Sequence, residues 1–276
     1  MGVLQAGLLN QPSAQVIDGS LKFDNSAYLK RTPSSAGNRR TWTWSAWYKS
    51  SQKTGTNRYL FAAGYNTTPW YGWIHQLADN SEFQVTYDAG VAAGFKTTPR
   101  YRDTGWYHVV WSHDSTQSTD TEKTKLYVNG VQVTDFDNTS YPSSYEEGPV
   151  NNTVLHELGG KADRATLEGS LSQVYLIDGL QLGPEYFGFT DPLTNTWKPK
   201  KYTGDFNGPA DTKSEEGSFS ATGNQVGGPI ANAYDGTIGQ QHGSTSGITF
   251  WGCSAGTAIQ SGLSSQLHHL LKFTTT

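Results

Sequence analysis

The sequence predicts an all-β protein, a two-sheet antiparallel sandwich followed by an irregular C-terminal extension. Three observations predict this class. From about residue 20 to 182, short runs of aromatic and β-branched residues alternate with turns rich in Gly, Asn, Ser and Thr. An Asn-Gly pair joins two of these runs, as in a hairpin. Helical patterns are nearly absent, which excludes a parallel α/β sheet. We expect about ten strands.

The first runs predict strands near the N-terminus. Leu21–Phe23 and Tyr28–Leu29 bracket three turn residues, and we expect them to form a tight strand pair. Residues 42–49 alternate with period two. The pattern places four of their side chains on one face of a half-buried strand: Trp42, Trp44, Ala46 and Tyr48.

The middle of the chain continues the pattern. Residues 59–62 and 82–87 read as strands, and residues 106–113 are apolar on both faces, as in a central strand. His108 and His113 then lie on opposite faces of that strand and cannot converge. We assign five tryptophans to the core: Trp42, Trp44, Trp47, Trp106 and Trp111.

Two hairpins can be registered from turn chemistry. Asn129-Gly130 is the preferred pair for a type I′ turn, and it sets Val128 against Val131 and Leu126 against Val133. Asp178-Gly179 predicts a second hairpin of the same kind, with Ile177 against Leu180.

The amino-acid composition changes at the end of the predicted sandwich. Pro184 opens one short helical turn over residues 183–187. Beyond residue 202 the chain is rich in Gly, Ser and Thr and reads as a linker, or as an arm that orders against a neighbour. The predicted division is therefore an N-terminal arm (1–13), a sandwich (14–202) and an extension (203–276).

Charge and cysteine content exclude several function classes. The chain has 20 Lys and Arg against 24 Asp and Glu, a net charge of −4, so a nucleic-acid partner is not expected. The single cysteine, Cys253, excludes an internal disulfide framework and a CxxC metal site. No apolar run approaches the ~18 residues of a membrane helix, and we expect no membrane insertion. The first residues lack the basic region of a signal peptide.

Six short motifs occur in a characteristic order along the sandwich. They are Ser20–Asp24 with Tyr28-Leu29, Trp44–Trp47, Gly105–Val109, Leu126–Gly130, Leu158–Gly160 and Gly169–Val174. Together they resemble a concanavalin A-like (laminin-G-like) jelly-roll domain over roughly residues 14–190. The resemblance implies two antiparallel sheets of six or seven strands.

A narrower resemblance concerns two longer segments. Residues 31–42 and 187–204 are similar to runs in laminin-G-like proteins of marine bacteriophages. This resemblance implies a virion component of a fibre, tail or capsid surface, with other virion subunits as partners. A polar extension of this kind gains order mainly by packing against another chain, so we expect a homo-oligomer. Residues 231–236 are similar to the opening of discoidin-like modules, and the extension reads as a truncated remnant of one.

The sequence offers no candidate catalytic residues. Glucanases of this fold carry carboxylates spaced Glu-x-Asp-x-Glu on one strand. Only the pairs Asp120/Glu122 and Asp135/Asp137 approach that spacing, each without a third carboxylate, and we expect them in solvated loops. The histidines show no metal-ligand spacing. The protein is therefore predicted not to be an enzyme.

Two binding hypotheses remain. The oxygens of Asp135, Asp137 and Asn138 could hold Ca²⁺, although turn chemistry after a hairpin also explains these residues. The aromatic run at residues 70–75 could stack on sugar rings, although core packing explains it too. The candidate ligand-binding residues in that run are Trp70, Tyr71, Trp73 and His75.

These observations predict a non-enzymatic virion protein that binds other subunits and a host surface glycan. Two alternatives are a glycoside-active enzyme of the concanavalin A-like class and a freestanding lectin.

Overall fold

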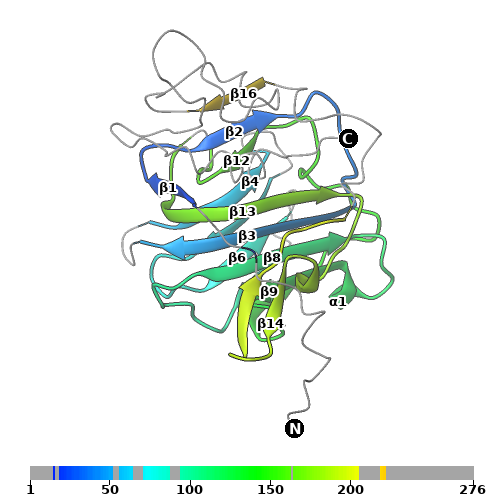
Figure 1. Ribbon diagram of the computed structural model, residues 1–276. Coiled ribbons are helices and arrows are strands. Elements are labelled where there is room, and N and C mark those ends of the chain that lie inside the picture. The colour runs from blue at the N-terminus through cyan, green and yellow to red at the C-terminus, as the bar shows by residue number, and fades with distance from the viewer. Residues whose placement is uncertain are drawn as a thin grey trace.

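A computed structural model gives the fold for residues 15, 19–51, 56–64, 71–87, 94–162, 164–204 and 218–221. Two antiparallel sheets pack face to face (Figure 1), which confirms the predicted all-β sandwich. The N-terminal arm, Trp70 and the discoidin-like segment at 231–236 lie outside the described residues. The division of the chain at residue 202 stays a prediction.

The first sheet has six strands in the order β1-β13-β3-β8-β9-β10. Their bounds are β1 Leu21–Asp24, β13 Glu168–Asp178, β3 Thr41–Ser50, β8 Tyr107–Asp114, β9 Thr124–Val128 and β10 Val131–Gln132.

The second sheet has eight strands in the order β11-β7-β6-β5-β4-β12-β2-β16. Their bounds are β11 Phe136–Ser140, β7 Gly94–Thr97, β6 Phe83–Thr86, β5 Gly72–Gln76, β4 Arg58–Ala63, β12 His156–Leu158, β2 Leu29–Thr32 and β16 Ser218–Ala221. The last of these strands belongs to the region predicted as an extension, and it pairs with β2.

The main core fills the space between the sheets. Trp44 of β3 lies opposite Trp111 of β8 in the six-stranded sheet, and its ring stacks on Phe61 of the eight-stranded sheet at 5.9 Å between centroids. The predicted inward face of β3 is confirmed, because all four of its side chains are buried in this core: Trp42, Trp44, Ala46 and Tyr48.

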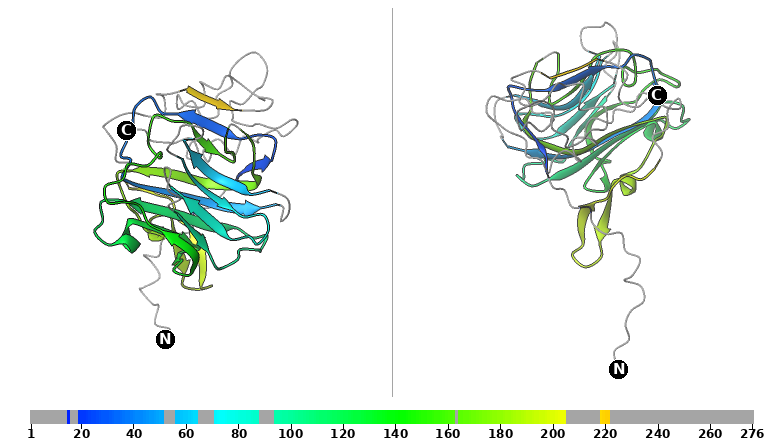
Figure 2. Two further views of the ribbon diagram at one scale, coloured as in Figure 1. Left: turned by 180° about the vertical axis from the view of Figure 1, so that it is seen from behind. Right: turned by 45° about the horizontal axis from the view of Figure 1, so that its top comes forward.

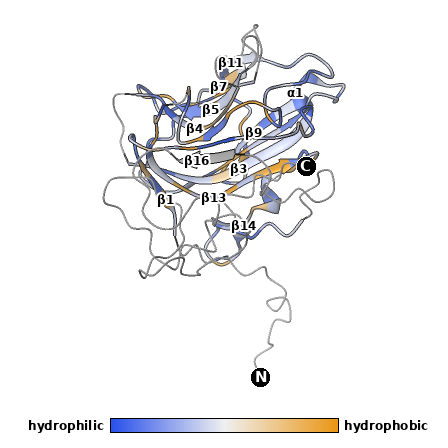
Figure 3. Cartoon of the chain, turned by 90° about the horizontal axis from the view of Figure 1, so that it is seen from above, coloured by the Kyte–Doolittle hydropathy of each residue, from blue (hydrophilic) through white to orange (hydrophobic). Residues whose placement is uncertain are grey.

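A second, smaller core covers the outer face of the six-stranded sheet. The hairpin of β14 (Gly188–Asp191) and β15 (Thr196–Pro199) lies against that face, as Figures 2 and 3 show from different sides. Its cluster contains Val110, Tyr175, Ile177, Leu182, Phe187 and Tyr202. The strands β3, β8 and β13 are therefore buried on both faces, which explains why residues 106–113 read as a central strand.

His108 and Trp197 join the hairpin to the sheet. Trp197 Nε1 donates a hydrogen bond of 3.0 Å to His108 Nδ1, and His108 Nε2 lies 3.0 Å from Ser45 Oγ. His108 stacks on Trp47, whereas His113 stacks on Trp42 in the main core. The prediction that the two histidines lie on opposite faces of β8 is confirmed.

Local turn chemistry gave two correct predictions. Asn129 and Gly130 have φ of 50° and 81°, and Val128 pairs with Val131 as registered. Val131 lies at the sheet edge and is 69% exposed, although the hairpin pattern placed it with buried neighbours. The short turn is a 3₁₀ helix, Pro184–Tyr186, with proline at its first position.

The predicted pairing of Leu21–Phe23 with Tyr28–Leu29 is wrong. Asn25 adopts φ of 64°, and the Asp24 carboxylate accepts a hydrogen bond from Ser26 N at 3.1 Å. This turn carries the chain from one sheet to the other, so that β1 pairs with β13 and β2 pairs with β12.

The predicted second hairpin is also wrong. Residues 180–182 form no strand, and the Thr43 hydroxyl donates to Leu180 O at 2.7 Å and accepts from Leu182 N at 2.8 Å. With these backbone groups bonded to a side chain of β3, the segment crosses the outer face of the sheet and adds Leu182 to the second core.

Two further expectations need correction. Trp106 is 37% exposed and does not belong to the core, because it precedes β8 at the surface. Asp120 and Glu122 lie not in a loop but on a single helical turn, α1 (Asp120–Lys123), where their carboxylates remain exposed.

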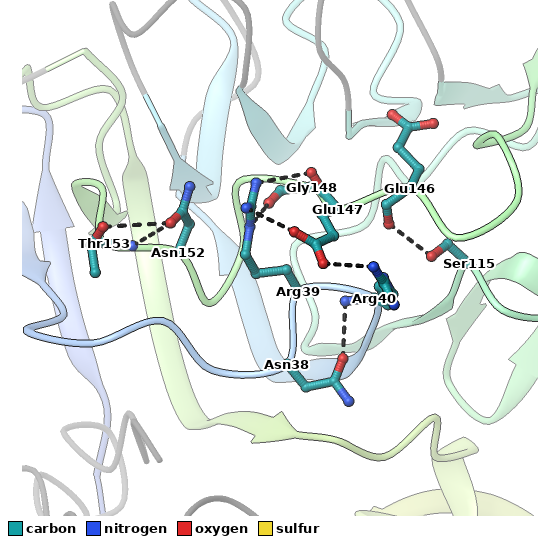
Figure 4. Close-up of polar contacts among 9 residues, drawn as sticks. All are labelled: Asn38, Arg39, Arg40, Ser115, Glu146, Glu147, Gly148, Asn152 and Thr153. Carbon is teal, nitrogen blue, oxygen red and sulfur yellow. Dashed lines mark hydrogen bonds and ion pairs between the residues drawn. The ribbon is translucent and has the colours of Figure 1, made fainter.

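The segment at residues 38–40, just before β3, binds the loop at residues 147–148 (Figure 4). Arg39 Nε donates to Gly148 O at 2.8 Å, and the guanidinium groups of Arg39 and Arg40 bind the Glu147 carboxylate at 3.1 and 2.8 Å. Asn38 Oδ1 accepts hydrogen bonds from the backbone N–H groups that follow it, at 3.0 and 2.9 Å. Part of the segment at residues 31–42 therefore anchors a loop.

Candidate ligand-binding face

The outer face of the eight-stranded sheet carries the predicted aromatic residues. Ile74 of β5 pairs with Val85 of β6, and both are buried in the main core. The neighbouring Trp73 and His75 therefore project from the opposite face, because side chains alternate along a strand. Tyr71 packs against Trp73. Of the two sets proposed from sequence, Tyr71, Trp73 and His75 form the outer one.

Tyr71 and Trp73 form a parallel stack, with 4.5 Å between ring centroids and 6° between planes. The Lys161 ammonium lies 3.4 Å from the Trp73 centroid. If the Tyr71 ring and the Lys161 ammonium were on the same face of the Trp73 indole at these distances, they would overlap. They therefore lie on opposite faces of the indole. Trp73 is thus covered on both sides, and the outer face of Tyr71, which is 38% exposed, is left open.

Lys161 is held by a second ring and by its own loop. Its ammonium lies 4.7 Å from the Tyr59 centroid and donates to Tyr59 Oη at 3.2 Å. The loop is fixed by a hydrogen bond of 3.0 Å from Ala162 N to Glu157 Oε2. Burial lowers the pKa of Lys161, and the Glu157 carboxylate opposes that shift. Nothing in the local sequence around Lys161 signals this contact with Trp73.

His75 is a buried member of the same face. It is 3% exposed and packs on the Tyr59 ring at 4.5 Å between centroids. Within the described part of the chain, neither ring nitrogen has a hydrogen-bond partner. Burial, and then the charges of Lys161 and Arg58, lower its pKa to about 3, so the imidazole is neutral at physiological pH.

A polar cavity lies beside these aromatic residues on the same sheet. Its volume is about 400 Å³, and it is lined by Gln84, Thr86, Gly94, Phe95, Lys96, Asp137 and Asn138. Strand register makes the two features neighbours, because Trp73 pairs with Thr86 and His75 with Gln84. Asp137 and Asn138 are two of the residues that the sequence offered as candidate calcium ligands or as turn residues after a hairpin.

Two of the three calcium candidates have oxygens that bind protein partners. Asp137 Oδ2 binds the Lys96 ammonium at 2.8 Å, and Asp137 Oδ1 accepts from Thr98 Oγ1 at 3.0 Å. Asp135 contributes its backbone oxygen to Thr98 N. Ca²⁺ takes six to eight oxygen ligands, and the described residues contain no group of three or more His, Cys, Asp or Glu side chains that could hold a metal ion.

The other carboxylate pair does not line this cavity. Asp120 binds Lys123 at 2.7 Å and Glu122 binds Lys125 at 2.5 Å on α1. α1 contacts β8 and β9 of the six-stranded sheet, whereas the cavity lies on the eight-stranded one.

Among the helices that the structure describes, none is long and apolar enough to span a membrane.

Several solved structures are similar to this chain at low sequence identity. A heptameric SAP-like pentraxin from Limulus polyphemus is 13% identical, with a TM-score of 0.44 over 59% of this chain and 76% of the pentraxin. Domain 4 of an extracellular arabinanase from Geobacillus stearothermophilus, in complex with arabinotriose, is 17% identical, with a TM-score of 0.45 over 63% and 77%. A putative carbohydrate-binding protein from Bacteroides ovatus is 16% identical, with a TM-score of 0.42 over 66% and 50%.

No curated protein matches the chain in sequence. A family model does match, over residues 23–180, which is more than half of the chain and spans the strands from β1 to β13. The protein therefore belongs to the concanavalin A-like lectin/glucanases superfamily.

Proposed function

We propose that this protein is a non-enzymatic carbohydrate-binding protein and that it binds glycan on the outer face of the eight-stranded sheet. One observation carries the proposal: the open ring of Tyr71 lies on the same sheet face as the polar cavity at Gln84 and Asn138. An aromatic face packs on the apolar side of a sugar ring, and amides and hydroxyls bind its hydroxyl groups. The sheet supplies both kinds of contact side by side.

The stack beneath Tyr71 supports this role. A ligand platform binds well when its own side chains are already ordered, because less conformational entropy is lost on binding. Tyr71 rests on Trp73, and Trp73 rests on the Lys161 ammonium, so the ring orientation is fixed before a ligand arrives.

A glycan array with the whole chain tests the proposal. Wild type should bind at least one saccharide class, and Tyr71→Ala should weaken that binding by about tenfold, or 1.4 kcal/mol. Tyr145→Ala is the matched control, because Tyr145 is exposed but lies in the loop at residues 143–152. Equal binding by all three proteins, or no binding by wild type, would contradict the proposal.

We further propose that the protein serves on a bacteriophage virion, in contact with other virion subunits or with copies of itself. Support comes from the resemblance of residues 31–42 and 187–204 to phage proteins. The β14–β15 hairpin exposes Leu193 at its tip (80% exposed), which offers a surface for such a contact. Mass spectrometry of purified particles tests this role, and absence of the protein from mature virions would refute it.

A further inference from the structure

The charges at the cavity cancel in pairs. The Lys96 ammonium binds Asp137 Oδ2 at 2.8 Å and lies 3.4 Å from Glu82 Oε2. Arg100 Nε binds Glu82 Oε1 at 3.3 Å. Two cations thus face two carboxylates, and Lys96, the only cationic group among the described residues that line this cavity, contacts both of these carboxylates.

We propose that the cavity takes an uncharged saccharide and that Asp137 determines this specificity by neutralising Lys96. The inference rests on the proposed function, and it names the ligand class of the same face. A carboxylated or sulfated sugar would lose part of its hydration without gaining an unpaired cation, and it would approach the carboxylates of Asp137 and Glu82. Burying a charge without an opposite charge is costly.

Neighbouring side chains support the pairing of Lys96 with Asp137. Asp137 Oδ1 accepts a hydrogen bond from Thr98 Oγ1 at 3.0 Å, so the carboxylate is held between Thr98 and Lys96. Glu82 is 2% exposed and cannot swing away from Lys96 into solvent. The hydrogen bond between Lys96 and Asp137 also raises the pKa of Lys96 and lowers the pKa of Asp137, so both groups stay charged at neutral pH.

The remaining polar groups of the cavity suit hydroxyl groups. Gln84 and Asn138 each present an amide that both donates and accepts, and Thr86 presents a hydroxyl. Sugar hydroxyls also donate and accept, so these side chains can bind them without any net charge. Lys161 on the same face is enclosed by Trp73 and Tyr59 and does not line the cavity.

Asp137→Asn tests the inference, because the amide keeps an acceptor for Thr98 but removes the charge that neutralises Lys96. The probes are galactan oligosaccharides of equal length, one unsulfated and one sulfated, titrated at low and at physiological salt. Wild type should prefer the unsulfated probe by at least about tenfold, and Asp137→Asn should reduce that preference by about tenfold with stronger salt dependence. Asp135→Asn makes the same charge change outside the cavity and should keep the wild-type preference.

Three outcomes would count against the inference in distinguishable ways. Wild type that binds the sulfated probe as tightly as the neutral one refutes the neutral specificity while leaving carbohydrate binding intact. A preference that Asp137→Asn does not change refutes the role of Asp137. Wild type that binds neither probe, nor any saccharide on the array, removes the proposed function itself, and the specificity falls with it. Urea unfolding of both variants verifies that they fold.

Discussion

Replacing Trp197 by phenylalanine should destabilise the protein through a single buried acceptor. Trp197 Nε1 can only donate, so His108 Nδ1 accepts this hydrogen bond and His108 Nε2 carries the proton that reaches Ser45 Oγ. His108 is completely buried. In Trp197→Phe, His108 Nδ1 loses its partner, and a change of tautomer only turns this nitrogen from an acceptor without a partner into a donor without one.

The magnitude follows from two terms. A buried polar atom left without a partner costs about 1–3 kcal/mol. The smaller ring also loses contact above Gly130 and Gly188, where an added Cβ would meet the indole at 2.5 Å, and we assign about 1 kcal/mol to this loss. The free energy of unfolding should therefore fall by about 2–4 kcal/mol.

Urea unfolding at pH 7.5, followed by circular dichroism, measures this change. Trp106→Phe is the matched control: it makes the same substitution at a partly exposed ring, and it should change the free energy of unfolding by less than about 0.5 kcal/mol. If Trp197→Phe also changes it by less than about 0.5 kcal/mol, the reasoning about His108 is wrong.

Two further predictions concern the remaining buried groups. Lys161→Met should lower the free energy of unfolding by about 0.5–2 kcal/mol and weaken glycan binding through Tyr71, because it removes the cation above Trp73. Lys161→Arg keeps the cation and should preserve both the stability and the binding. Equal behaviour of the two variants would contradict the cation–π contact. Burial lowers the pKa of three histidines to about 3 and of a fourth to about 4, namely His75, His108, His113 and His156. Unfolded imidazoles bind protons near pH 6.5, so the unfolded state takes up more protons than the folded state below that pH, and the free energy of unfolding falls as the pH decreases from 6.5 to about 4. Urea midpoints measured at pH 7.5, 6 and 5 test this, and an unchanged midpoint would refute it.

Turns with local causes could be predicted from the sequence. Asn129-Gly130 fixes its own hairpin because both residues accept positive φ at little cost. Asp178-Gly179 has the same chemistry, and Gly179 also has positive φ (77°), yet no hairpin follows. Gly179 N donates to Thr41 O instead, and the side chain of Thr43 binds the next backbone groups. That choice depends on a strand far away in the sequence.

The candidate site also depends on contacts between residues that are far apart in the sequence. Period two placed Tyr71, Trp73 and His75 on one face, and the structure agrees. Which of the three is open depends on Lys161, which reaches Trp73 from a distant loop. The cavity combines residues of β6, β7 and β11, which the strand order brings together, so single segments of sequence give no sign of it.

The second core has a consequence for where the folding unit ends. The family match stops at residue 180, but Val110, Tyr175 and Ile177 are covered by the residues that follow, as far as Tyr202. A chain shortened to residue 180 would lack Trp197, which stacks on His108, and would leave His108 and these three side chains exposed to water. Exposed apolar patches of this kind promote aggregation. The smallest soluble form of this protein should therefore extend beyond the family homology and include the β14–β15 hairpin and Tyr202.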